Sequence, residues 1–168
     1  MAFDRFEIWI DPTQFIHWPD GGGFQPVGII INDEPLIDLV RRIEQPFVQE
    51  EFRQRVEAGE DLKELHFLAG DYQYLPPSLV LLPCRNLLDN PRKPGFMLEP
   101  GDSRNGKATV LGCTCGVIDC WFLQVRISLK KDRIIWSEFG QFHRDWPYEL
   151  GPFIYNRRQY ETELTKQV

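Results

Sequence analysis

The sequence lacks any long run of apolar residues. Its longest stretches, such as 27–31 and 79–82, are far shorter than the roughly 20 residues needed to cross a bilayer, so we expect no membrane span and no membrane partner. The first residues, MAFDRFEIWIDP, also lack the basic region and longer apolar run of a signal peptide. Together these absences predict a cytoplasmic protein, in which thiols stay mostly reduced.

Basic residues are too few to balance the acidic ones. Lys and Arg number 19 against 25 Asp and Glu, which gives a formal net charge of -6. Only residues 121–168 have a slight basic excess. Because nucleic-acid binding depends on counterion release by a basic surface, the sequence predicts no nucleic-acid partner.

A complete catalytic signature is also missing. The chain has three histidines, and no Ser or Asp stands with His143 in an arrangement typical of a catalytic triad. The segment HWPDGGGF does not have the form of a phosphate-binding loop. The sequence therefore does not favour an enzyme.

The chain contains 42% hydrophobic residues, which is enough to form the core of a folded protein. We expect a single domain over residues 1–168. Three amphipathic helices are expected. The first begins at Asp33 as N-cap and ends before Pro46, and the second covers about 47–58. The third follows Asn156 as N-cap.

Strands are expected in several short segments. FEIWI at 6–10 and VGIII at 27–31 predict an antiparallel pair. A short strand is expected at 78–82, and the Pro- and Gly-rich segment 87–106 predicts a long loop with a brief strand at 96–99. The predicted fold is α+β: one antiparallel sheet built from the N-terminal pair, the strand at 78–82 and a C-terminal three-stranded meander, with helices mainly on one side.

Residues 107–137 predict that meander. If 116–119 form its first loop, Cys115 faces Cys120 and Val110 faces Val125. The next turn places Trp136 opposite Ile127 and Ile134 opposite Leu129. Five apolar residues then share the core face: Val110, Leu123, Val125, Ile127 and Trp136. Thr109 is expected on the opposite, polar face, where substitution by Asp should be mild.

Three of the four cysteines lie in LGCTCGVIDCWF, residues 111–122. In the expected register Cys113, Cys115 and Cys120 lie at the loop end of the hairpin on the face opposite the core, so their sulfurs should be mutually close. Three interpretations remain open: packing under a covering layer, a zinc site, or redox chemistry. The spacing is not the paired C-x2-C of zinc ribbons, which weakens the metal interpretation.

A zinc site would need a fourth ligand besides the three cysteines. The chain offers five candidates for it: His143, Cys84, His66, His17 and Asp119. His143 is the best of them, because the strand that precedes it lies beside the cysteine hairpin. The predicted metal ligands are therefore Cys113, Cys115, Cys120 and His143, with zinc as the candidate cofactor.

Aromatic residues crowd the segment between Trp136 and Tyr160. Such residues usually close a core over a sheet edge, and the alternative is a groove for a protein partner or a homodimer contact.

The motifs LGCTCG, CW, WSEF, FHR and GPFIYNRRQYE resemble those of a family of small bacterial proteins with a C-x-C-G hairpin, a downstream His-Arg and a terminal GPF helix. The resemblance is clearest over 111–161 and implies a common fold but no reaction.

These features favour a small cytoplasmic binding or regulatory protein that acts through protein contacts. The alternative is a thiol- or metal-dependent enzyme with its site at the Cys113, Cys115 and Cys120 hairpin tip. A bound metal, or a pocket that holds His143 with the thiols, would favour the second interpretation.

Overall fold

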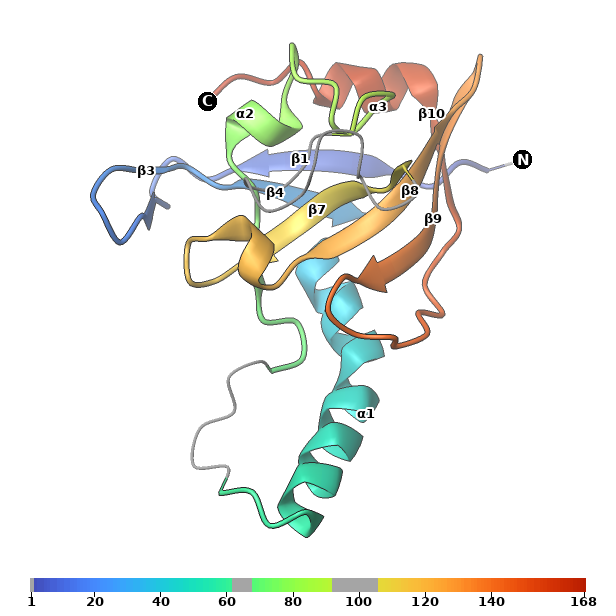
Figure 1. Cartoon of the computed structure of the whole chain (residues 1–168). Helices are drawn as coiled ribbons and strands as arrows, with labels where there is room; N and C mark the ends of the chain where they lie inside the picture. The colour runs from blue at the N-terminus through green and yellow to red at the C-terminus, as the bar shows by residue number, and fades with distance from the viewer. Residues whose placement is uncertain (1, 62–67, 92–105) are drawn as a thin grey trace.

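The computed structural model describes residues 2–61, 68–91 and 106–168, without the side chain of Asp119 (Figure 1). It confirms an α+β fold of helices and antiparallel sheets. The strands are β1 (Phe6–Ile10), β2 (Ile16–His17), β3 (Gly23–Phe24), β4 (Val27–Ile31), β5 (Glu34–Pro35), β6 (Tyr72–Gln73), β7 (Ala108–Cys113), β8 (Leu123–Leu129), β9 (Arg133–Gln141) and β10 (Phe153–Asn156). The helices are α1 (Leu36–Glu57), α2 (Pro77–Val80) and α3 (Arg157–Glu163), with a 3-10 turn η2 at Ile118–Cys120.

The strands form separate sheets with the orders β1-β4-β5, β10-β9-β8-β7-β6 and β2-β3. The expected antiparallel pair of 6–10 with 27–31 is confirmed as β1 with β4. The expectation that this pair joins the meander in one sheet is wrong. The meander instead gains β6 and β10 as its edge strands, and both sheets contribute to the same hydrophobic core.

The turn before α1 differs from the sequence expectation. Asn32 and Asp33 both have positive φ, at 51° and 66°, and connect β4 to β5 as a two-residue hairpin turn. Asn and Asp tolerate this left-handed conformation better than most residues, which suits them to such turns. Asp33 is therefore a turn residue and not an N-cap, and α1 begins three residues later with Pro35 at its N-cap.

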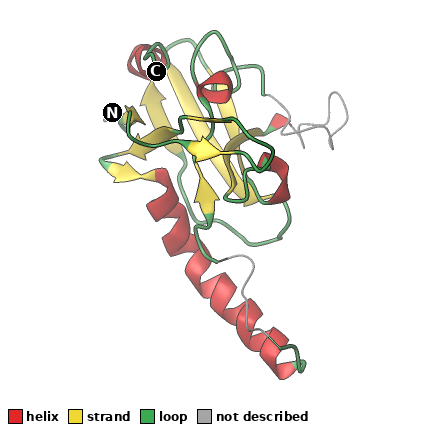
Figure 2. Cartoon of the chain, turned by 90° about the vertical axis from the view of Figure 1, so that its left-hand side faces the viewer, coloured by secondary structure: helices red, strands yellow, loops and turns green. Residues whose placement is uncertain are grey.

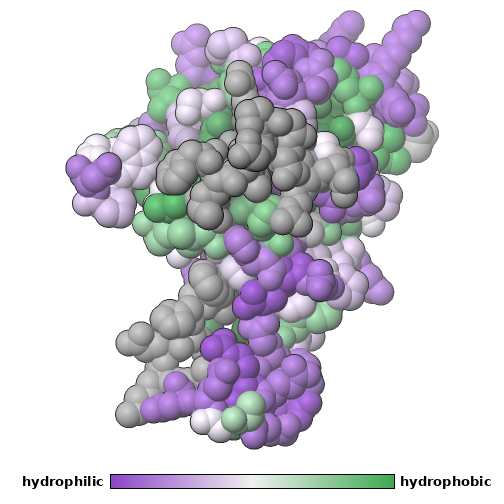
Figure 3. Space-filling view, viewed as in Figure 1, coloured by the Kyte–Doolittle hydropathy of each residue, from purple (hydrophilic) through white to green (hydrophobic). Residues whose placement is uncertain are grey.

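The two helices expected on either side of Pro46 are one continuous helix, α1. Proline removes one helical hydrogen bond and its ring crowds the preceding turn. Here Pro46 is exposed, while Val40 and Leu36 on another face of the helix are fully buried. After the proline, Phe47 stacks on Trp146 with 5.9 Å between ring centroids and Glu51 accepts a hydrogen bond of 2.7 Å from Arg144, so tertiary contacts hold α1 on both sides of Pro46. Figures 1 and 2 show α1 extending away from the sheets, and Figure 3 shows mostly hydrophilic side chains over its far end.

The strand expected at 78–82 is wrong, because this segment begins with the short helix α2. Pro77 lies at the start of the helix, where its fixed φ is favourable and its missing N–H costs nothing. The brief strand expected at 96–99 lies outside the described residues. No helix among the residues placed by the structure is both long and apolar enough to cross a membrane.

The meander is confirmed, but only one of its two predicted registers is right. Ile127 pairs with Trp136 and Leu129 with Ile134, as expected from the tight turn between β8 and β9. On the other side Ala108 pairs with Val125, and the pairing shifts before Leu111 meets Leu123. The expected register, with Val110 opposite Val125, is therefore wrong. The irregularity and the 3-10 turn in the loop both alter the spacing of the two strands.

All residues of β7 are buried, so this strand has no solvent-facing side. The expected core residues Val110, Leu123, Val125 and Trp136 are fully buried, and Ile127 is half-buried against them. Thr109, expected on the polar face, is only 3% exposed. A second layer of chain therefore covers the face that the sequence pattern left to solvent.

The helix α3 closes the core beside β1. Its expected N-cap is confirmed: the Asn156 side chain accepts a hydrogen bond of 3.0 Å from the backbone N–H of Gln159. The rings of Phe6 and Tyr160 pack 4.2 Å apart between β1 and α3. The backbone N–H of Ile8 donates to the carboxylate of Glu163 at 2.9 Å, so side chains of α3 satisfy the open edge of β1.

Candidate metal site at the cysteine hairpin

The tip of the β7–β8 hairpin brings its three cysteines close together. β7 ends at Cys113, and the backbone N–H of Gly116 donates to the Cys113 carbonyl at 3.2 Å. Gly116 has φ +93°, a conformation that side chains rarely adopt. The chain then enters η2, whose last residue is Cys120. This tight path returns Cys120 to the end of β7.

The three sulfurs of Cys113, Cys115 and Cys120 all lie within 4.8 Å of one another. All four cysteines are free thiols. The predicted proximity of the three sulfurs is therefore confirmed. The expected position is wrong for Cys113, which is only 4% exposed and belongs to the hydrophobic core, whereas Cys115 and Cys120 are exposed. The cluster thus has one buried and two accessible members.

The surroundings of Cys113 and Cys115 shift the pKa values of their thiols in opposite directions. Burial raises the pKa of Cys113 to about 12, because its thiolate would lie in apolar surroundings. Burial also acts to raise the pKa of Cys115, but hydrogen bonds from the Val117 N–H and from the other two thiols outweigh it and lower that pKa. Deprotonation is therefore easier at Cys115 than at Cys113, because the hydrogen bonds that reach the Cys115 sulfur stabilise its thiolate form.

Within the described parts of the chain, the group of close ligand atoms consists of the three sulfurs, and His143 does not belong to it. Its ring lies nearly parallel to that of Trp121, with 6.2 Å between centroids, and edge-on to Phe142 at 4.9 Å. Because Trp121 directly follows Cys120, His143 is a neighbour of the hairpin tip but is packed among aromatic rings. Its role as a ligand stays a prediction.

Of the other proposed fourth ligands the structure describes Cys84 and His17, and neither belongs to the sulfur cluster. Cys84 is half-buried in the segment after α2 and is not part of the sulfur cluster. His66 lies outside the described residues, as does the side chain of Asp119. His17 is in β2, and its ring packs 4.9 Å from that of Phe15.

The β2–β3 hairpin flanks the cysteine tip. A Cβ atom added at Gly116 would lie 3.4 Å from the Cδ atom of Pro19 and 3.8 Å from Cδ1 of Trp18. Trp18 is nevertheless 43% exposed. Trp18 and Pro19 therefore lie beside Gly116 of the cysteine tip, while Cys115 and Cys120 remain exposed to solvent.

The aromatic segment near the C-terminus builds the core. Trp136, Tyr155 and Tyr160 are fully buried. The other members are buried or half-buried, and none is exposed: Phe139, Phe142, Trp146, Tyr148 and Phe153. Nothing in their exposure supports a partner groove at this segment.

A buried carboxylate is the main feature that the sequence interpretation missed. Glu44 of α1 is fully buried and accepts hydrogen bonds from the hydroxyls of Tyr72 and Tyr148 and, at 2.9 Å, from the backbone N–H of Gly70. Burial raises its pKa, although these hydrogen bonds act in the opposite direction. One signal was present in the sequence, because Glu44 lies four residues after the buried Val40 and so on the same helix face. The cluster ties α1 to the sheet.

Comparisons with known proteins add no assignment to this geometry. No family model, no curated protein and no solved structure matches the chain. The resemblance to a bacterial family is thus unsupported by the comparisons. The site rests on the positions and chemistry of its own residues.

Proposed function

We propose that the protein binds a zinc ion through the thiolates of Cys113, Cys115 and Cys120. The observation that carries this proposal is the convergence of the three sulfurs within 4.8 Å of one another. Zn–S bonds of about 2.3 Å at tetrahedral angles place sulfurs about 3.8 Å apart. Small side-chain movements would therefore complete three corners of a zinc site.

Metal binding would also change the protonation of the cluster. Zinc binds thiolates and releases their protons, so its positive charge would add to the hydrogen bonds that already lower the pKa of Cys115. Three thiolates with one Zn²⁺ carry a net charge of -1, less than three free thiolates would. A charge this small suits a site with one buried member.

The fourth ligand comes from the solvent side in this proposal, because Cys115 and Cys120 are exposed and Cys113 closes the inner side. Water is the first choice, and zinc sites with three protein ligands commonly hold one. His143 is the second choice and would have to leave its stacked position on Trp121. The open side also leaves room for a protein partner or a second copy of the chain to supply a ligand. A reducing compartment, such as the cytoplasm expected from the sequence, would keep the thiols available.

Zinc titration in competition with a chromophoric chelator tests the proposal. The reduced protein should take up one zinc ion per chain. Replacing Cys113, Cys115 or Cys120 by Ser should each weaken binding by at least about tenfold, or about 1.4 kcal/mol. Cys84→Ser is the matched control and should leave the affinity unchanged. Absence of zinc uptake, or equal affinities in the Cys115→Ser and Cys84→Ser proteins, would contradict the proposal.

His143→Ala separates the two choices for the fourth ligand. With water at that position, the variant should keep the affinity of the unchanged protein. A loss comparable with that of the cysteine variants would assign the position to His143. Either result leaves the three-thiolate site intact.

A further inference from the structure

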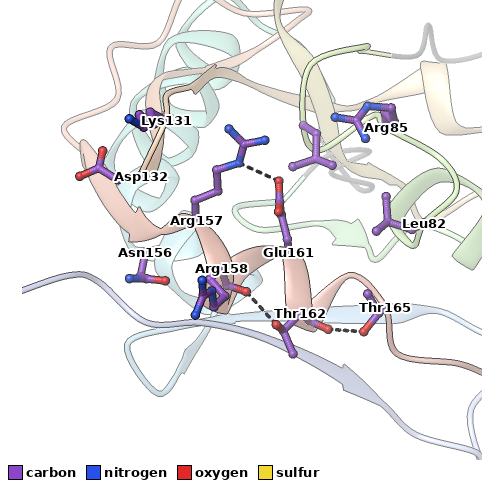
Figure 4. Close-up of a pocket in the computed structure, with 11 residues that line it drawn as sticks. Leu82, Arg85, Lys131, Asp132, Asn156, Arg157, Arg158, Glu161, Thr162 and Thr165 are labelled. Atoms are coloured by element: carbon purple, nitrogen blue, oxygen red, sulfur yellow. Dashed lines mark hydrogen bonds and ion pairs between the residues drawn. The ribbon is translucent and has the colours of Figure 1, made fainter.

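A cavity that the cysteines do not line lies between three segments that are distant in sequence. It has a volume of about 890 Å³ and is lined by residues of the loop after α2, the β8–β9 turn and α3. Figure 4 shows Arg157 and Glu161 projecting from α3 into the space between the turn that carries Lys131 and the loop that carries Arg85. The size is in the range of small-molecule sites.

The lining of this cavity is basic in a chain that is acidic as a whole. Four of the lining side chains are cationic, Arg85, Lys131, Arg157 and Arg158, and two are acidic. The chain carries a formal charge of -6. Among the described residues, Lys131 and Arg158 form no ion pair. Asp89 pairs with Arg85 just outside the lining, and counting its carboxylate still leaves a local excess of one positive charge, which favours an anion.

Two of the guanidinium groups are held in place by the protein. Arg157 donates to Glu161 from Nε and to the Lys130 carbonyl from Nη1, each at 2.9 Å. Its Nη2 has no acceptor within the described parts of the chain.

Arg85 is held in a similar way. It donates to both carboxylate oxygens of Asp89, from Nε at 2.6 Å and from Nη2 at 3.0 Å, and its Nη1 is left without an acceptor among residues the structure places. Each arginine is thus oriented and keeps donors for a ligand, and orientation reduces the entropy lost on binding.

Apolar side chains complete the wall beside these charges. Leu82 is half-buried and Leu88 is almost fully buried, and both line the cavity. A ligand that fills this space would therefore place an apolar organic part against the leucines and its anionic group against the arginines.

We propose that this cavity binds a small phosphate monoester, with the phosphate at Arg85, Lys131 and Arg157 and the organic part against Leu82 and Leu88. A phosphate monoester carries a charge of about -1.5 to -2 at neutral pH and offers three acceptor oxygens. These properties suit the positive charge excess and the oriented N–H donors. A carboxylate supplies half of that charge, so it should bind more weakly. The proposal goes beyond the metal site and does not depend on it.

Titration of the full chain with phenyl phosphate, followed by calorimetry or by NMR shifts, tests this inference. Binding should saturate at one ligand per chain and weaken as salt is added. Lys131→Gln and Arg85→Gln should each reduce the affinity by at least about fivefold, in keeping with the loss of one charge-assisted contact. Lys130→Gln, which removes the same charge from a neighbouring residue outside the lining, should leave it unchanged.

Comparisons with other anions separate this site from general attraction to charge. Benzoate should bind more weakly than phenyl phosphate, and inorganic phosphate should too, because it lacks the ring that contacts the leucines. Equal loss of affinity in Lys130→Gln and Lys131→Gln would overturn the proposal. So would the absence of saturable binding at millimolar phenyl phosphate, or equal binding of benzoate. Lys131 lies in an exposed turn, so its variant should fold normally and keep the test decisive.

Discussion

The backbone N–H of Val117 donates a hydrogen bond of 3.4 Å to the sulfur of Cys115. This bond holds the most accessible part of the hairpin tip in a fixed curve, with the Cys115 sulfur turned toward those of Cys113 and Cys120. The local structure of the tip therefore brings the three thiols together, although Cys113 is buried and Cys115 and Cys120 are exposed.

Exposure predicts the order in which the cysteines react. With iodoacetamide and no metal, Cys115 and Cys120 should be alkylated before Cys113, because only the first two are exposed. Peptide mapping by mass spectrometry at increasing times measures the order. Zinc should slow alkylation of both exposed thiols and leave the half-buried Cys84 unaffected. Early modification of Cys113 would show that the tip does not adopt this structure.

Burial of both faces of β7, and of residues 123–125 in β8, predicts two severe substitutions. Val125→Asp should destabilise by more than about 3 kcal/mol, because it places an unpaired charge in the core. Thr109→Asp should destabilise by a similar amount, because Thr109 is only 3% exposed. The alternating pattern of the sequence alone predicts a mild effect. Ser78→Asp at an exposed position of α2 should stay within about 0.5 kcal/mol. Urea denaturation measures all three, and a mild effect of Thr109→Asp would reject the burial of that face.

Thr109 also allows the opposite test. Its hydroxyl is buried and has no hydrogen-bond partner in the described chain. Replacing it by Val removes this unsatisfied group and keeps the shape of the side chain, so the free energy of unfolding should stay equal or rise. A loss of more than about 1 kcal/mol would show that the hydroxyl is bonded in solution.

Glu44 predicts a pH-dependent contribution to stability. Burial raises its pKa in the folded protein above the ordinary value of 4.5. The folded state therefore holds this proton more tightly than the unfolded chain does. The resulting stabilisation is complete below the unfolded pKa and is lost as the pH rises through the folded pKa.

The comparison with Glu44→Gln isolates this effect from other titrating groups. The free energy of unfolding of the unchanged protein minus that of the variant should fall between about pH 4 and the raised pKa, and should be constant above it. Urea denaturation at a series of pH values measures the difference. A difference that increases with pH over this range would mean that the pKa of Glu44 is lowered.

The continuity of α1 through Pro46 predicts a stabilising substitution. Pro46→Ala restores a helical N–H that can donate to the carbonyl of Arg42 and removes the crowding of the ring. Because Pro46 is exposed, no core packing is lost. The free energy of unfolding should rise, by up to about 3 kcal/mol. Thermal melts that show a lower midpoint would indicate that α1 is broken at this residue.

Short-range patterns predicted well the parts of the fold that depend on them. The β8–β9 register follows from a tight turn, and the alternation around Ile127 and Trp136 was sufficient to find it. The N-cap at Asn156 is likewise a local signal. Asn32 and Asp33 show the limit of such signals, because the same residue types favour both helix caps and hairpin turns.

Features that depend on tertiary contacts could not be predicted. The shift in pairing between Thr109 and Leu111 requires knowledge of both strands and of the loop that joins them. The burial of Cys113 depends on chain that covers β7, which the alternation of residues on β7 itself does not reveal. The proximity of the three sulfurs was nevertheless predictable, since it needs only that the hairpin return near its starting point.

X-ray absorption at the zinc edge, on reduced protein loaded with one equivalent of zinc, tests the proposed site most directly. The account predicts three sulfur neighbours at about 2.3 Å and one oxygen or nitrogen neighbour at about 2.0–2.1 Å. Retention of zinc with fewer than three sulfur neighbours, or failure of the protein to retain zinc, would contradict it.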